Sequence, residues 1–373
     1  MSHYTVEGVD IEKLPKVSLH DHLDGSLRAE SLLELADEAG VSTPEDNADD
    51  LGDWFISQSN SGSLEKYLTT FDLTCAVAQT APALERIARE SVIDLARDGV
   101  IYGELRWAPE QHLTRGLSLD ETVEAVQEGI AQGIAEAARS GKAIRIGQLV
   151  TAMRHADRAR EIAELALRHR DRGVVGFDIA GAEAGFLASK HASAFDLLAS
   201  AYFPTTVHAG EADGLESIRS AVLDGRALRL GHGVRIAEDI TIENSDDEVS
   251  YVKLGRLAEW VKDRAITLEL CPTSNLQTGA VAQWGATLEE HPFDLLYQLD
   301  FCVTVNSDNR LQSGTSLSRE LSLLVDAFGY TLSDIEQFQQ NACASAFIPA
   351  EDRDELAETI SNGFEAAVST SRR

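Results

Sequence analysis

Residues 17–26, VSLHDHLDGS, place two histidines two positions apart at the end of an apolar segment. If this segment is a β-strand, His20 and His22 project from the same face, because successive side chains alternate between the faces. Their Cα atoms would then lie about 7 Å apart, close enough for two imidazoles to reach one metal ion. Such pairs are more often surface or packed histidines, so a metal site requires ligands from other segments.

Polar side chains also stand at the ends of three further apolar segments. His208 and Glu211 end VHAGE, His232 lies within LGHGV, and Asp308 and Asn309 end VNSDN. Taken singly, a histidine at a strand end usually packs, and an aspartate there often caps the next helix. Four of the ten histidines at such positions favour one shared metal centre instead. Three imidazoles and a carboxylate suit zinc, which leaves one position for water and activates it near neutral pH.

Short β-branched segments alternate with helical patterns along the chain, such as those of residues 84–99, 161–173 and 217–225. This alternation predicts a parallel sheet, and eight strands are the number that closes a (β/α)8 TIM barrel. In such a barrel, polar residues at the C-terminal strand ends carry the chemistry. A doubly wound sheet is the alternative, but the chain offers no glycine-rich phosphate turn. The eight expected strands lie within 17–22, 100–107, 144–153, 174–181, 204–211, 228–234, 266–275 and 301–308.

The rest of the chain is expected to complete one metal-dependent hydrolase domain over residues 1–373. The acidic segment 236–249 is interpreted as a loop after the sixth strand, and the last fifty or so residues as helices that cover the barrel.

Composition limits the classes of partner. The chain has 32 basic and 62 acidic residues, a net charge of −30, which disfavours nucleic acid and anionic membranes as partners. A neutral or cationic small molecule meets no such penalty. No apolar stretch of about 18 residues indicates a membrane span, and the N-terminus does not resemble a secretory signal. The four scattered cysteines are interpreted as reduced thiols in a cytoplasmic protein.

Seven motifs occur in a fixed order along nearly the whole chain: LHDHLDGSL, SLEKYLTTFDL, GFDIAG, HAGE, LGHG, CPTSNL and NSDN. This ordered set resembles the adenosine deaminases of the amidohydrolase superfamily. The resemblance implies a TIM barrel with additional helices over its C-terminal face and at the C-terminus. It also implies hydrolytic deamination of adenosine and 2′-deoxyadenosine, a small-molecule purine nucleoside substrate and one zinc ion per subunit. The oligomeric state stays open.

The resemblance also assigns roles to individual residues. Glu211 matches the acid that protonates the purine N1, and His232 matches the residue that orients and assists the attacking hydroxide. Gly181 matches a backbone contact to purine N3, and Asp24 matches the carboxylate that holds the ribose 5′-hydroxyl. Asp308 belongs to the catalytic group and His22 to the substrate contacts as well as to the metal site. The implied zinc ligands are His20, His22, His208 and Asp308.

Physical chemistry agrees with the role of Glu211, because burial in a partly apolar barrel mouth raises a carboxyl pKa and keeps it protonated. A charge at the start of a helix is the simpler alternative for this residue.

Asn309 departs from the family pattern, since many relatives have a second aspartate there that contacts purine N7. An amide can donate to N7 without acquiring a proton.

Three other features bear on the site. The spacing of Leu64, Tyr67, Leu68 and Phe71 predicts one helix face, which is either core packing or, by resemblance, a hydrophobic lid. The fourth strand segment, VVGFDIAG, lacks the lysine that bridges two metals in other superfamily members, which favours one metal. CPTS does not match the P-C-x-x-C of cytidine-type deaminases.

Two alternative functions remain beside adenosine deamination. One is a deaminase of another 6-aminopurine such as adenine or AMP. A carboxylate at Asp24 would repel the phosphate of AMP, and adenine deaminases tend to carry glutamate at this position. The other is a metal-binding barrel without activity, although Glu211 and His232 are both present.

Overall fold

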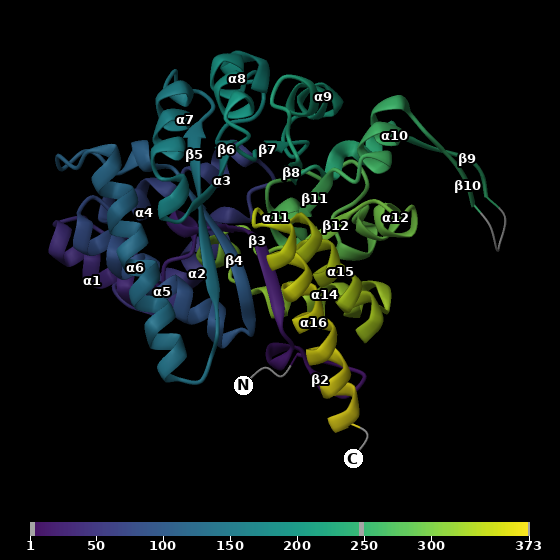
Figure 1. Ribbon diagram of the computed structural model, residues 1–373, viewed down its shortest axis with the longest axis horizontal. Helices are drawn as coiled ribbons and strands as arrows, with labels where there is room; N and C mark the ends of the chain where they lie inside the picture. The colour runs from purple at the N-terminus through teal and green to yellow at the C-terminus, as the bar shows by residue number, and fades with distance from the viewer. Residues whose placement is uncertain (1–3, 246–249, 372–373) are drawn as a thin grey trace.

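The computed structural model describes residues 4–245 and 250–371, and within them the eight barrel strands fall in the eight expected segments (Figure 1). Each strand is followed by helical chain before the next strand begins, as a parallel barrel requires. The barrel strands are β3 (Lys16–His22), β4 (Val100–Trp107), β5 (Arg145–Met153), β6 (Val174–Ala180), β7 (Thr206–Ala209), β8 (Arg229–His232), β11 (Thr267–Leu270) and β12 (Val303–Val305).

The strands pair in parallel as two four-stranded sheets, β3-β4-β5-β6 and β7-β8-β11-β12. Single bridges close the barrel at both seams: Phe177 pairs with Thr205, and Asp21 pairs with Asp308. At the second seam the His22 amide donates to the Asp308 carbonyl at 2.7 Å, and the Asp308 amide donates to the His20 carbonyl at 3.0 Å. Closure therefore brings the ends of the first and last barrel strands together. The TIM-barrel prediction is confirmed.

Amphipathic helices surround the strands and bury their apolar faces against them. In α5, Leu84, Ile87, Ala88 and Val92 are buried at the spacing of one helix face. The α-helix that most closely precedes each next barrel strand is α5 (Ala81–Arg97), α6 (Leu119–Arg139), α7 (Ala159–Arg168), α8 (Ala192–Ser200), α9 (Leu215–Leu223), α10 (Arg256–Asp263) or α12 (Phe293–Gln298). The additional helices are α1 (Ala29–Ala39), α2 (Ala48–Ser59), α3 (Leu64–Leu68), α4 (Phe71–Val77), α11 (Pro272–Gln277), α13 (Arg310–Ser313), α14 (Leu317–Phe328), α15 (Leu332–Ser345) and α16 (Ala350–Ser371).

The turn from α5 into β4 depends on Gly99. Its φ is +81°, and a Cβ there would lie 2.6 Å from the carbonyl oxygens of both Glu12 and Leu14. A side chain would therefore suffer both backbone strain and a steric clash. This close approach lets β4 start beside β3.

The segment 236–249 is not the simple loop that its acidic composition predicted. Residues 236–239 end a 3-10 helix, Val234–Asp239. The chain then forms β9 (Ile240–Ser245), which pairs antiparallel with β10 (Ser250–Leu254) in a hairpin that projects away from the barrel (Figure 1). The β-branched run Ile240, Thr241 and Ile242 explains the strand, because such residues favour extended backbone. Residues 246–249 lie outside the described part of the chain. At the N-terminus, β1 (Thr5–Val6) pairs antiparallel with β2 (Val9–Asp10).

The expected single helix over Leu64–Phe71 is also wrong in detail. The segment forms two short helices, α3 and α4, that break between Leu68 and Phe71. The Thr69 and Thr70 hydroxyls donate to the carbonyls of Lys66 and Tyr67 at 2.7 and 2.8 Å. Threonines that bond to nearby carbonyls offer the backbone an alternative to the helical ladder, which explains the break. No helix among the described residues combines the length and apolarity needed to cross a membrane.

Candidate active site

The four predicted metal ligands meet at the C-terminal end of the barrel. His22 Nε2 lies 3.2 Å from His208 Nε2, and Asp308 Oδ1 lies 3.3 Å from His20 Nε2 and 3.4 Å from His22 Nε2. Ligand atoms around a tetrahedral zinc ion with bonds near 2.1 Å are about 3.4 Å apart. The buried His20 Nε2 has no hydrogen-bond partner among the described residues. The spacing and this free nitrogen fit a zinc-sized ion.

Carboxylates behind two of the imidazoles fix their orientation. His20 Nδ1 lies 3.0 Å from Glu269 Oε2, and His208 Nδ1 lies 2.8 Å from Asp178 Oδ2. A carboxylate at Nδ1 holds the proton there and leaves the Nε2 lone pair free for a metal. Burial also lowers the pKa of His208, which keeps its ring neutral as a ligand must be.

Asp308 and His232 both have backbone conformations that side chains rarely adopt. Their φ values are +58° and +63°. Such strain persists only where the surrounding structure imposes it, and it is frequent at functional sites. The Ser274 hydroxyl donates to Asp308 Oδ2 at 2.6 Å, so Oδ1 remains directed at the histidines.

A relay of hydrogen bonds sets the protonation of His232. The Phe293 amide donates to His291 Nδ1 at 3.0 Å, so the proton of neutral His291 is on Nε2, 3.3 Å from Asn275 Oδ1. The amide nitrogen of Asn275 is then the donor to His232 Nδ1 at 3.0 Å. Burial lowers the pKa of His232 well below its usual range. Neutral His232 therefore carries its proton on Nε2, which lies 3.5 Å from Glu211 Oε2.

Glu211 stands on a loop that one carboxylate organises. Glu183 accepts hydrogen bonds from the backbone amides of residues 210–213, at 2.6 to 3.0 Å, and from the Ser217 hydroxyl at 2.6 Å. Burial raises the pKa of Glu211 well above its usual range, and the charges of Asp308 and Glu183 add to the effect. The side chain expected to donate a proton is thus held in its protonated form.

Two connected hollows adjoin these residues. The inner cavity, of about 40 Å³, is lined by the predicted lid side chains and by His22, Glu211, His232 and Asn309. The outer cavity, of about 290 Å³, is lined by Asp24, Gln111, Met153 and His155 among others, and Gly181 borders both. The predicted site residues therefore all lie around one region: His20, His22, Asp24, Gly181, His208, Glu211, His232, Asp308 and Asn309. Leu64, Tyr67, Leu68 and Phe71 face the inner cavity together although they come from two helices.

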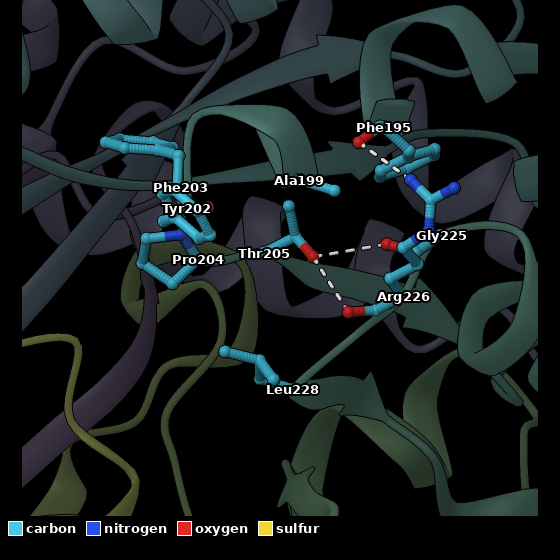
Figure 2. A pocket seen from close by; sticks show the side chains of 9 residues that line it. All are labelled: Phe195, Ala199, Tyr202, Phe203, Pro204, Thr205, Gly225, Arg226 and Leu228. Atoms are coloured by element: carbon cyan, nitrogen blue, oxygen red, sulfur yellow. Dashed lines mark hydrogen bonds between the residues drawn. The ribbon is translucent and has the colours of Figure 1, made fainter. Parts of the chain in front are cut away.

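A separate hollow lies at the opposite end of β7 and β8 (Figure 2). The Thr205 hydroxyl donates to the carbonyls of Gly225 and Arg226 at 3.2 and 3.4 Å, and Arg226 donates to the Phe195 carbonyl at 3.2 Å (Figure 2). The lining residues contain no histidine, cysteine or carboxylate. This hollow cannot hold a metal ion, and it lies at the end of the barrel that stabilises the fold.

Sequence reasoning did not identify the residues that position the site. Glu183 could have been found, because it follows the fourth barrel strand closely and the C-terminal strand ends were the place to look. Glu269 lies inside a strand and belongs to none of the seven motifs. Asp178 belongs to GFDIAG and Asn275, which is buried in α11, belongs to CPTSNL, but neither motif indicated which histidine the residue contacts.

Comparison with known proteins gives a consistent result. The family model described as adenosine deaminase matches residues 15–363. Adenosine deaminase 1 of Streptomyces coelicolor is 56% identical over 344 residues, 92% of this chain and 85% of that protein. The adenosine deaminase of Mycobacterium ulcerans is 53% identical over 351 residues, which cover 94% of this chain and 95% of that protein. An amidohydrolase structure from Burkholderia ambifaria with bound zinc superposes with a TM-score of 0.81 at 22% identity, covering 97% of this chain and 93% of the other.

Proposed function

This chain belongs to the adenosine deaminase family, and we propose that it hydrolyses adenosine and 2′-deoxyadenosine to inosine and 2′-deoxyinosine with release of ammonia. One zinc ion per subunit is held by His20, His22, His208 and Asp308. The observation that supports this proposal is the spacing of 3.2 to 3.4 Å between ligand atoms from strands far apart in the sequence.

When bound, zinc acts as a Lewis acid that makes water nucleophilic near neutral pH. The Nε2 proton of His232 is directed toward the reaction centre and orients the attacking oxygen. Glu211 gives its proton to purine N1 as the ring loses aromaticity at C6, which relieves the charge that builds on the ring. The oxygen of the attacking water bonds to C6, one of its protons passes to the amino group, and the C6–N bond breaks so that ammonia leaves. N1 keeps the proton that Glu211 gave, and the second proton of the water restores Glu211.

The remaining residues hold the nucleoside. The Gly181 backbone contacts N3, the Asn309 amide donates to N7, and Asp24 accepts from the ribose 5′-hydroxyl. Tyr67 and Phe71, with the other lid side chains of the inner cavity, exclude bulk water from the reacting atoms.

A nucleoside fits this site better than a nucleotide. Burial raises the pKa of Asp24 to about 7, so a substantial fraction of this carboxyl is charged at neutral pH and repels a 5′-phosphate. The enzyme acts as a single domain over residues 1–373 in the cytoplasm. The four free cysteines agree with a reducing compartment.

The test follows the ultraviolet absorbance of adenosine, 2′-deoxyadenosine, adenine and AMP with zinc-loaded protein. The two nucleosides should lose their adenine-type band as inosine-type product forms, and AMP and adenine should react far more slowly. Asp24→Asn should narrow the preference for adenosine over AMP. Equal kcat/KM for adenosine and AMP would contradict the nucleoside assignment, and no reaction with any purine would indicate an inactive metal-binding barrel.

A further inference from the structure

A second cluster of metal-ligating side chains lies beside the outer cavity. It consists of Asp24, Cys75 from α4, and His112, which follows the 3-10 turn Pro109–Gln111. One ligand atom from each residue lies within 4.8 Å of the other two. Cys75 and His112 have no part in the proposed catalysis, so this second cluster needs its own explanation.

His112 is prepared to act as a ligand. Its Nδ1 lies 2.8 Å from the Ala78 carbonyl, which accepts hydrogen bonds only, so Nδ1 carries the ring proton. Its Nε2 is left with a lone pair, and this buried atom has no hydrogen-bond partner among the described residues. The ring is 1% exposed and packs beside Trp107, with centroids 5.6 Å apart. A buried lone pair without a partner is costly, so a ligand at Nε2 would relieve a real deficit.

Asp24 supplies a second buried ligand atom that lacks a partner. Its Oδ2 accepts from the Ala108 amide at 3.4 Å, whereas its buried Oδ1 accepts no hydrogen bond from any residue that the structure describes. The residue is 7% exposed, and the nearest ring nitrogen to Oδ1 is His22 Nδ1 at 3.8 Å. The third ligand is a half-buried thiol: Cys75 Sγ donates to Gln111 Oε1 at 2.9 Å.

We propose that Cys75, His112 and Asp24 form a second metal site that takes a thiophilic divalent cation such as Zn²⁺, and that its occupation inhibits the enzyme. Thiolate, imidazole and carboxylate are the ligands that zinc prefers, and they lie about 3.4 to 3.8 Å apart around a tetrahedral ion. Atoms already within 4.8 Å of each other need only small side-chain shifts to reach that spacing. The Gln111 amide oxygen or a water completes the coordination.

The site has an entry path and a consequence for the substrate. Asp24 and Gln111 both line the outer cavity, so a cation reaches the second cluster by the route that the nucleoside uses. A cation held at Asp24 Oδ1 occupies the carboxylate proposed for the ribose 5′-hydroxyl. Inhibition is therefore competitive with adenosine, a consequence that rests on the proposed function.

The test titrates Co²⁺ into protein whose catalytic site is already filled with Zn²⁺. A thiolate-to-cobalt charge-transfer band in the near ultraviolet reports a sulfur ligand, and the catalytic ligand set contains no sulfur. We expect the band to saturate at one added Co²⁺ per chain. Cys75→Ser should abolish the band, and His112→Gln should weaken cobalt binding at least tenfold. Cys302→Ser, a loss of another half-buried thiol, is the matched control and should keep the band.

Kinetics test the link to the substrate separately. Added Zn²⁺ should raise the KM for adenosine without changing kcat in the wild-type protein, and Cys75→Ser should remove this inhibition. A wild-type protein without the band, or a band that persists in Cys75→Ser, overturns the second site. A normal band combined with inhibition that adenosine does not relieve overturns the competition at Asp24. Loss of the proposed deaminase activity would leave the cobalt result intact, so the two proposals fail independently.

Discussion

The interior of the barrel and its mouth both bury polar and charged side chains. They differ in what these side chains contact. In the interior, Arg106 pairs with Asp178 at 2.9 Å and with Glu269 at 2.7 Å. Arg229 pairs with Glu104 at 2.5 Å and with Glu269 at 2.6 Å. At the mouth, the Nε2 atoms of the histidines converge on one another and on a carboxylate oxygen, at the spacing that a bound cation requires.

The difference explains how one barrel is both stable and reactive. Buried charges are tolerated where each has an opposite charge in contact. The interior pairs meet that condition, and their carboxylates also hold the Nδ1 protons of His20 and His208. The interior thereby fixes the rings at the mouth, so that their Nε2 lone pairs are directed at the place where a cation would bind. The ion pairs of the interior therefore position the histidine rings at the mouth.

The largest expected effect comes from removing a ligand at the mouth. In His208→Ala we expect most of the metal to be lost, because only three ligands remain and Asp178 loses one of its two partners. Turnover should then fall by about 10⁶-fold or more, toward the uncatalysed rate. Elemental analysis and the adenosine assay measure both effects. His169→Gln removes a buried histidine that pairs with Asp120 on the outside of the barrel, and this control should keep its metal. Full metal occupancy in His208→Ala would exclude this residue from the ligands.

Glu211→Gln should retain the metal and the nucleoside but lose about 10²–10⁴-fold in kcat, because shape is kept and the transferable proton is removed. The raised pKa of Glu211 also fixes the direction of the pH profile. The protonated form is the active one, so kcat/KM in the wild-type protein should fall as the pH rises through that pKa. A wild-type rate in the glutamine variant, or an alkaline limb that persists unchanged in its residual activity, would contradict the proton-donor role.

In the paired interior, Glu269→Gln should lower the free energy of unfolding by about 3–5 kcal/mol, because Arg106 and Arg229 lose a shared counter-charge. Burial alone would raise the pKa of Glu269, but the two arginines hold it well below its usual range. Its stabilisation is therefore complete above the unfolded-state pKa of about 4.3 and is lost as the pH falls through the native pKa.

Urea unfolding at neutral and acidic pH measures this effect. Glu216→Gln is the matched control, because it breaks an exposed pair with Arg219, and the loss of such a solvent-screened pair should leave the free energy of unfolding almost unchanged. Equal stability changes in the two variants would show that the interior charges are not a tightly coupled set.

The smallest effect should come from Asn309, whose Oδ1 is buried without a hydrogen-bond partner among the described residues. Asn309→Ala removes the proposed donor to N7 and should weaken adenosine binding by about 1–3 kcal/mol. Binding of 7-deazaadenosine, which lacks that acceptor, should hardly change. Equal weakening of both compounds would mean that Asn309 has only a structural role.

The sequence was sufficient to locate the barrel strands and to select the side chains that the structure brings together at the candidate site. The β-branched segments that end in His22, His208 and His232 gave the right strands, because strand propensity and the position of a polar residue at a strand end are local properties. The same local reasoning failed for 236–249, where the acidic composition obscured a β-branched run. It also failed where Thr69 and Thr70 interrupt the expected lid helix.

By itself, then, the sequence determined which side chains could bind a metal ion and protonate a purine, since residue type and strand position carry that information. Only the tertiary structure decided which atoms of those side chains face the metal site and which are held by hydrogen bonds. Barrel closure brings Asp308 to His20, and Glu269 reaches His20 although it lies six barrel strands later in the chain. His291 fixes the proton on His232 through Asn275. These contacts join residues tens to hundreds of positions apart. Their distances follow from packing in three dimensions, which no local pattern encodes.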